Sequence, residues 1–319
     1  MTELFDLGGI VAVVMVAYQS SLLQALLNGY ATPAMYAEEL GLDAMATERV
    51  LDVLAQVGVA DCEQGRYAAS ADLKQLNAWQ LGGLDALGAL WSQVPAFLSR
   101  GERLAHMDGS LAMREAAYSG VVSQLAEVFR EGARQLAERL PGRPAHILDV
   151  GAGAGVWSLA MARRYPETRV TALDLPKVLV AFCRQAEQMG LADRIETLAG
   201  DFHHVELPRG RFDRIVLANV LHLEPPEQAA ALIRRVVRSL AGGGDLVIVE
   251  MLGDGTPAGE RARAVYALHL ALRTRQGRTH TLSDLQAWVE QAGLIPGEVL
   301  RPGIWPGMGA LVALVPLQE

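Results

Sequence analysis

A glycine-rich motif in the second half of the chain carries the clearest chemical signal. Asp149 ends an apolar stretch and is followed by Gly151, Gly153 and Gly155. Glycines in a turn between a strand and a helix let a ligand lie against the backbone, so the motif predicts a small-molecule site, with a purely structural turn as the alternative. Val156 stands where a dinucleotide fingerprint needs Gly or Ala, and the Gly-Lys-Ser/Thr of a phosphate-binding loop is absent.

Two further carboxylates follow the next apolar stretches. Asp174 precedes Leu175 and is placed to accept hydrogen bonds from both ribose hydroxyls of an adenosine ligand, although helix capping is a second role compatible with this position. Asp201 and Phe202 end the next stretch. There the carboxylate is placed to accept from an adenine amino group and the ring to pack on its face, with a structural turn as the alternative. The pattern predicts an adenosine site.

Alternating strands and helices position these motifs. The predicted strands are residues 146–150, 169–173, 195–199, 214–218, 245–250 and 310–315, and the predicted helices between them include 157–165, 176–189 and 226–240. Such alternation predicts an α/β fold with a mostly parallel sheet and helices on both faces. Ligands of open α/β sheets bind at the carboxyl ends of the strands, where the three aspartates fall.

The front of the chain, residues 1–140, is predicted to be mainly helical. Thr32-Pro33 is typical of a helix start, a second helix is expected at about 47–57, and a turn at Gln64-Gly65 predicts a short hairpin. Helix, turn, helix and hairpin together predict a winged helix. Residues 31–70 contain seven acidic residues and two arginines. DNA binding needs the opposite balance of charge, so a dimerisation or lid module is favoured.

Further helices are predicted at residues 81–98 and 113–140, before a Pro-Gly-Arg-Pro segment that marks a domain boundary. The expected domains are residues 1–140 and 141–319.

Composition limits the possible classes of protein. The chain has 319 residues, 51% of them hydrophobic, and a formal net charge of −8. That content excludes a disordered chain, and the acidic balance argues against binding nucleic acid or anionic lipid. Cys62 and Cys183 cannot form a disulfide framework, and the apolar run 10–17 is too short to cross a bilayer. We therefore expect a soluble, cytoplasmic protein.

Together the motifs resemble the S-adenosylmethionine-dependent small-molecule O-methyltransferases, a family that includes the plant caffeate and the bacterial polyketide and phenazine enzymes. The resemblance extends from the winged-helix front through the three aspartate motifs to residues 219–222 and 243–250. It implies a homodimer whose first domain dimerises and whose second, Rossmann-type domain binds S-adenosylmethionine and carries the catalytic base. The residues expected to contact the cofactor are Asp149, Gly151, Gly153, Asp174, Leu175, Asp201, Phe202 and Asn219.

The family's catalytic base corresponds to His222, and its acidic partner to Glu250. An imidazole is suited to take the proton of a phenol, and an acid on its far nitrogen fixes the tautomer. A satisfied structural histidine is the alternative. The usual Asp-Trp after the base is Leu223-Glu224 here, and Thr279 stands where a second acid is expected. These departures leave open N-, S- or C-methylation, or a non-methylating relative of the hydroxylase, decarboxylase or pericyclase type.

The predicted methyl acceptor is a hydroxyl of a small aromatic or polyketide-like compound of secondary metabolism. Its contacts are expected from helices between about residues 90 and 128 and from the loop 303–308, with core packing as the alternative. No metal is expected, because His203 and His204 lack further ligands at suitable spacing. The candidate substrate residues are Met113, Tyr118, Trp305 and Met308.

Overall fold

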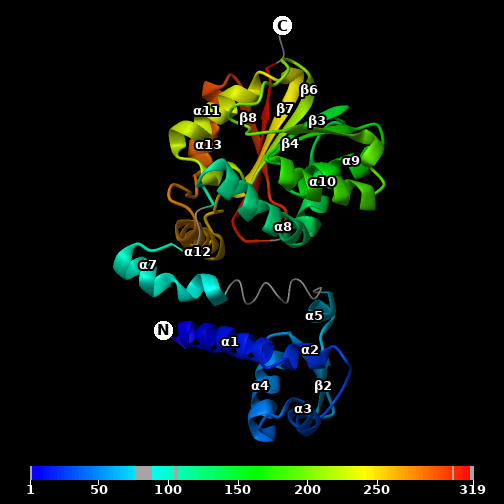
Figure 1. Cartoon of the computed structure of the whole chain (residues 1–319), viewed down its shortest axis with the longest axis vertical. Coiled ribbons are helices and arrows are strands. Elements are labelled where there is room, and N and C mark those ends of the chain that lie inside the picture. Colours follow the sequence, from blue (N-terminus) through cyan, green and yellow to red (C-terminus); the bar gives the residue numbers. More distant parts are fainter. Residues whose placement is uncertain (1, 76–87, 104–106, 304, 317–319) are drawn as a thin grey trace. The chain divides into compact units, whose positions relative to one another are not determined.

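A computed structural model describes residues 2–75, 88–103, 107–303 and 305–316 of the chain. The chain divides into two compact units, Met1–Ser92 and Gln93–Glu319 (Figure 1). The long helix α8 (Leu111–Arg139), which the sequence placed in the N-terminal domain, packs on helices of the second unit. The functional division after residue 140 stays a prediction.

The described part of the first unit is formed by helices and a hairpin. Its elements are α1 (Thr2–Gln19), α2 (Leu22–Leu26), α3 (Pro33–Leu40), α4 (Ala44–Gln56), β1 (Ala60–Glu63), β2 (Arg66–Ala69) and α5 (Ala71–Gln75). The Thr32 hydroxyl caps α3 by accepting from the N–H of Met35, as Thr32-Pro33 predicted. The Asp43 carboxylate caps α4 by accepting from the N–H of Ala46, so this helix begins three residues before its predicted start. The predicted order of helix, helix and hairpin is present.

The second unit is built on a seven-stranded sheet with the strand order β5-β4-β3-β6-β7-β9-β8. Neighbouring strands from β5 to β7 pair in parallel, and β9 is antiparallel to both of its neighbours. The strands are β3 (His146–Val150), β4 (Arg169–Asp174), β5 (Ile195–Ala199), β6 (Phe212–Ala218), β7 (Leu240–Met251), β8 (Ile295–Leu300) and β9 (Met308–Leu314). This confirms the α/β fold and its mostly parallel sheet.

Helices cover both faces of this sheet (Figure 1). One apolar cluster joins α8, α9 and α10 to one face, and a second joins α11 and α13 to the other. The remaining elements of this unit are α7 (Val94–Arg100), α9 (Val156–Arg164), α10 (Pro176–Gln188), η1 (Ala192–Arg194), η2 (Leu221–Leu223), α11 (Pro226–Val237), α12 (Pro257–Arg273) and α13 (Leu282–Gln291).

Several elements differ from the prediction. The strand β8 was missed because Pro296 and Gly297 argue against a strand, yet β8 is an edge strand with an irregular register, where proline is tolerated. The helix predicted at 226–240 ends at Val237, because β7 begins at Leu240. The helices α12 and α13 were not predicted. Of the helix predicted at 81–98, residues 81–87 lie outside the described residues.

Candidate active site

The glycine loop after β3 approaches the segment after β6 closely. Gly151 has a φ of +68°, and a Cβ at this position would lie 2.6 Å from Cγ2 of Val220. Both the left-handed backbone and the lack of space therefore require glycine here. Gly153, with a φ of +57°, donates its N–H to Oδ2 of Asp174 at 2.8 Å. The loop is thereby fixed to the end of the neighbouring strand.

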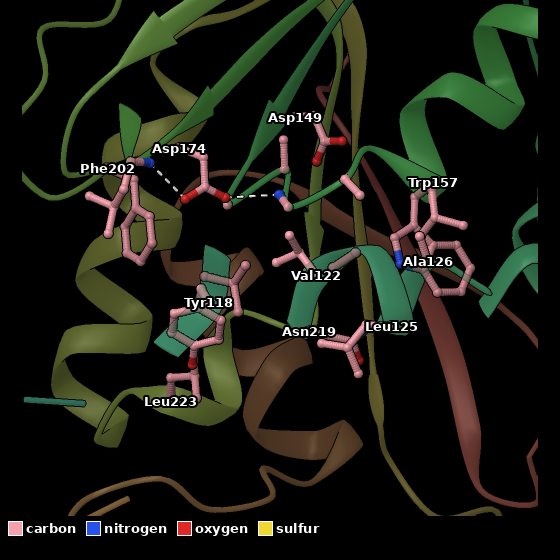
Figure 2. A pocket seen from close by; sticks show the side chains of 18 of the residues that line it. Tyr118, Val122, Leu125, Ala126, Asp149, Trp157, Asp174, Phe202, Asn219 and Leu223 are labelled. Atoms are coloured by element: carbon pink, nitrogen blue, oxygen red, sulfur yellow. Dashed lines mark hydrogen bonds between the residues drawn. The ribbon is translucent and has the colours of Figure 1, made fainter. Parts of the chain in front are cut away.

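A cavity of about 850 Å³, measured with its open mouth, lies beside this loop (Figure 2). Its walls come from the glycine loop, from α8 and from the segments that follow β4, β5 and β6. The structure thus brings together all eight residues that the sequence predicted as cofactor contacts, namely Asp149, Gly151, Gly153, Asp174, Leu175, Asp201, Phe202 and Asn219.

The Asp174 carboxylate lines the cavity. Its Oδ1 accepts the N–H of Leu175 at 2.7 Å and its Oδ2 accepts that of Gly153 at 2.8 Å, as the dashed lines in Figure 2 show. Each carboxylate oxygen has two acceptor positions, so one on each oxygen is left for a ligand hydroxyl. Burial raises the pKa of Asp174, and the two backbone hydrogen bonds oppose that rise. This arrangement fits the ribose diol of S-adenosylmethionine.

Asp149 lies deeper, at the end of β3. It is buried, and its Oδ2 accepts the hydroxyl of Ser158 on α9. Burial raises the pKa of Asp149 to about 7. The carboxyl group therefore ties the sheet to the first turn of α9 and carries only part of a negative charge at neutral pH.

At the other end of the cavity, Asp201 and Phe202 meet an arginine that the sequence analysis missed. Nη1 of Arg114 lies 3.8 Å from Oδ2 of Asp201. Its guanidinium carbon lies 5.3 Å from the centroid of the Phe202 ring. Oδ1 of Asp201 accepts the N–H of His203 at 2.9 Å. Arg114 thus balances the negative charge of Asp201. Because Arg114 lies on α8, far from Asp201 in the sequence, only the fold brings the two side chains together.

His222 and Glu250 form a buried pair next to the cavity. Nδ1 of His222 lies 2.7 Å from Oε2 of Glu250, and the backbone N–H of His222 donates to Oε1 of the same carboxylate at 3.2 Å. On the other side of the ring, Nε2 lies 3.3 Å from the hydroxyl of Tyr266 on α12. His222 follows Asn219 and Val220, which line the cavity. The single turn η2 thus connects the cavity wall to the histidine.

The segment around Thr279 supports the backbone of η2. The N–H of Arg278 donates to the carbonyl oxygen of His222 at 2.8 Å. Nε2 of the buried His280 donates to the carbonyl oxygens of Leu221 at 2.9 Å and Glu224 at 3.2 Å. The segment where a second acid was expected thus holds the histidine through its main chain. The departure at Thr279 was visible in the sequence, whereas the role of His280 was not.

The predicted substrate residues lie in different surroundings. Tyr118 lines the cavity, and its hydroxyl is buried with no hydrogen-bond partner among the described residues. Met113 is 48% exposed, and Met308 is buried in β9. Trp305 packs edge-on against Phe129, with ring centroids 5.6 Å apart. Of these four, Tyr118 alone is among the residues described as lining the cavity, and Ile304 of the predicted loop lies outside the described residues.

Two further properties concern the described residues only. They contain no group of three or more His, Cys, Asp and Glu side chains that could hold a metal ion. None of their helices is both long and apolar enough to cross a membrane.

The chain is similar to known proteins. Residues 128–295, just over half of the chain, match the family model of the O-methyltransferase domain. The 3-hydroxy-5-methyl-1-naphthoate 3-O-methyltransferase of Streptomyces sahachiroi is 26% identical over 93% of this chain and 89% of its own length. The L-tyrosine C(3)-methyltransferase of Streptomyces lavendulae is 26% identical over 86% and 81%.

Among solved structures, human N-acetylserotonin methyltransferase in complex with S-adenosylmethionine has the same fold. Its TM-score is 0.77 at 20% identity, covering 98% of this chain and 97% of that one. The chain belongs to the O-methyltransferase family and is an S-adenosylmethionine-dependent methyltransferase.

Proposed function

We propose that the protein methylates a hydroxyl of a small aromatic or polyketide-like metabolite, with His222 as the general base. The observation that supports this most directly is the buried His222–Glu250 pair, 2.7 Å apart, on the turn that follows the cavity wall. The acceptors named for the two relatives, a hydroxynaphthoate and tyrosine, each carry an aromatic hydroxyl. When bound, S-adenosylmethionine supplies an electrophilic methyl group.

In this proposal Glu250 fixes the tautomer of His222. A carboxylate accepts and does not donate, so Nδ1 carries the hydrogen and the lone pair lies on Nε2. The hydroxyl of Tyr266, 3.3 Å from Nε2, marks the direction from which a hydroxyl reaches that lone pair. Burial raises the pKa of Tyr266, so this phenol stays neutral. The acceptor hydroxyl replaces it, gives its proton to Nε2, and Glu250 stabilises the imidazolium that forms.

The cavity residues would hold the cofactor. Asp174 would accept the two ribose hydroxyls through its remaining acceptor positions, and Gly151 and Gly153 would let the ligand approach the backbone. Asp201 would accept from the adenine amino group, and the ring of Phe202 would pack on its face. Fixing both reactants supplies a large part of the rate, because the reacting atoms are held in line.

We also propose how the protein assembles and where in the cell it is located. Residues 1–140 would form a winged-helix dimerisation and lid domain of a cytoplasmic homodimer. The first unit exposes the apolar side chains of Val11, Val16, Met35 and Met45, which a second copy would cover. The thiols of Cys62 and Cys183 are free, as in a reducing compartment. Light scattering should give twice the 34.3 kDa of one chain, and a monomer at micromolar concentration would contradict the dimer.

The replacement His222→Ala tests the proposed base. With a panel of phenols and hydroxynaphthoates, release of S-adenosylhomocysteine should fall about 10²–10⁴-fold, the usual contribution of a general base. The affinity for S-adenosylmethionine, measured by calorimetry, should stay within about twofold, because the described lining of the cavity does not include His222.

His146→Ala is the matched control. This histidine is at the start of β3, opposite the carboxyl edge of the sheet, and contacts Thr171. Unchanged turnover in His222→Ala would remove His222 from the mechanism. Product mass and the position of the added methyl separate O-methylation from C-methylation and from a reaction without methyl transfer.

A further inference from the structure

The proposed mechanism does not use Arg273, in the last turn of α12. Its Nε is buried and has no hydrogen-bond partner among the described residues. Its Nη1 donates to the sulfur of Met107 at 3.4 Å, and its Nη2 lies 3.4 Å from Nδ1 of His269. Both partners are neutral groups. In the part of the chain that the structure describes, no carboxylate lies within 4.0 Å of this guanidinium.

A cation with a buried nitrogen and no counter-ion is unfavourable, because it loses hydration and gains little in return. Burial lowers the pKa of Arg273, which reflects this loss. The buried Arg214, by contrast, has a counter-ion. Nε and Nη2 of Arg214 each bind an oxygen of Asp245 at 2.6 Å. Arg273 therefore lacks the anion that a buried guanidinium normally has.

Arg273 lies on the same face of α12 as Tyr266 and His269, whose rings form a chain of contacts to the proposed base His222. Residues three, four and seven positions apart lie on one face of a helix. The ring of Tyr266 lies 5.5 Å from that of His222, and the ring of His269 lies 5.9 Å from that of Tyr266. The guanidinium, next to His269, is thus two ring contacts away from His222.

Two carboxylates lie near this face: besides burial, the charge of Glu250 raises the pKa of Tyr266, and the charge of Asp108 raises the pKa of Tyr118. Burial, together with the charge of Arg273, lowers the pKa of His269 to about 3, so His269 carries no charge near neutral pH. Burial likewise raises the pKa of Tyr118, which lines the cavity and whose hydroxyl has no partner among the described residues. Among Tyr118, Tyr266, His269 and Arg273, the guanidinium of Arg273 is the charged group, and Tyr118 adds a neutral donor.

We propose that Arg273 binds a carboxylate of the methyl acceptor, which makes the acceptor a hydroxylated aromatic acid. This inference rests on the proposed function. The hydroxyl of the acceptor lies at Nε2 of His222, the carboxylate lies at the guanidinium, and the aromatic ring system spans the distance past Tyr266 and His269. A planar guanidinium suits this role, because its forked donors match the two oxygens of a carboxylate.

Matched pairs of acceptors test this inference. The probes are 3-hydroxybenzoate, 4-hydroxybenzoate, 3-hydroxy-2-naphthoate and 6-hydroxy-2-naphthoate, each assayed against its methyl ester. We expect the unmodified protein to prefer the acid of the best pair at least tenfold in kcat/KM. Arg273→Gln should raise KM for that acid about 10–100-fold and leave the ester nearly unaffected, and Arg273→Lys should recover part of the loss. Calorimetric titration of the same acid should show the same order of affinities without turnover.

The control is Arg261→Gln, an exposed arginine on the same helix, which should behave as the unmodified protein. The melting temperature of Arg273→Gln should not fall, whereas a purely structural arginine would lower it. Equal use of acids and esters, or an acid preference that survives Arg273→Gln, would overturn the inference and leave the proposed function intact. No release of S-adenosylhomocysteine with either class would count against both.

Discussion

The replacement Glu250→Gln separates the orientation of His222 from its chemistry. Glutamine has the shape of glutamate, so it fills the same buried space. Its oxygen is able to accept the backbone N–H of His222, as Oε1 of Glu250 does at 3.2 Å. Its amide nitrogen then lies where Oε2 now accepts from Nδ1 at 2.7 Å. Two donors facing each other are unfavourable, so the imidazole proton moves to Nε2, and the lone pair that must receive the acceptor's proton is lost.

The size of the effect follows from that loss. General-base catalysis contributes about 10²–10⁴-fold, and the corresponding change in a catalytic triad, where the acid becomes an amide, costs about 10⁴-fold. We therefore expect kcat to fall about 10³–10⁴-fold, which corresponds to roughly 4–5.5 kcal/mol in the activation free energy. The residual rate comes from holding the two reactants in line, which the substitution leaves unchanged.

The assay is the release of S-adenosylhomocysteine at saturating cofactor and acceptor, with cofactor affinity measured separately. Glu224→Gln is the matched control, because Glu224 is also buried and lies 2.9 Å from a different histidine, His203. It should cost less than tenfold. The double variant with His222→Ala should be no slower than His222→Ala alone, because residues that act as one unit are not additive. A Glu250→Gln enzyme within tenfold of normal, or a further large loss in the double variant, would refute the reasoning.

Two more predictions concern the cofactor wall. Asp174→Asn should weaken S-adenosylmethionine binding about 10–100-fold, since hydrogen bonds to a charged group contribute about 1.5–3 kcal/mol, and calorimetry that shows less than a twofold change would exclude the ribose assignment. Asp149 has a folded-state pKa raised to about 7 by burial, so its contribution to stability is complete below about pH 4 and is lost as the pH rises through 7. Asp149→Asn should therefore remove up to about 4 kcal/mol of this pH dependence in urea unfolding between pH 4 and 8, and parallel curves would contradict it.

The residues proposed to bind the cofactor were predictable because each is identified by the sequence pattern immediately around it. Asp149, Asp174 and Asp201 each lie at or just beyond the end of a strand that the apolar pattern identifies, and a parallel sheet brings the carboxyl ends of its strands to one edge. No long-range contact had to be known. The same rule placed His222 and Glu250 at neighbouring strand ends, where the structure joins them.

The residues proposed to contact the methyl acceptor were not predictable in this way. Tyr266 and Arg273 lie on α12, whose apolar and polar residues do not separate into clear faces, so periodicity gave no signal. A helix start was nonetheless visible at Thr256-Pro257, the same pair that identified α3 at Thr32-Pro33. His280 reaches η2 from a loop that precedes α13, and such a contact depends on tertiary packing that no spacing rule supplies.

These contacts give a physical explanation for Thr279, which stands where a second acid was expected. One carboxylate, Glu250, already binds both the ring and the backbone of His222, and Arg278 and His280 hold the main chain of the turn from the other side. The backbone contacts of residues 278 and 280 therefore hold the turn that carries His222 without a carboxylate at position 279.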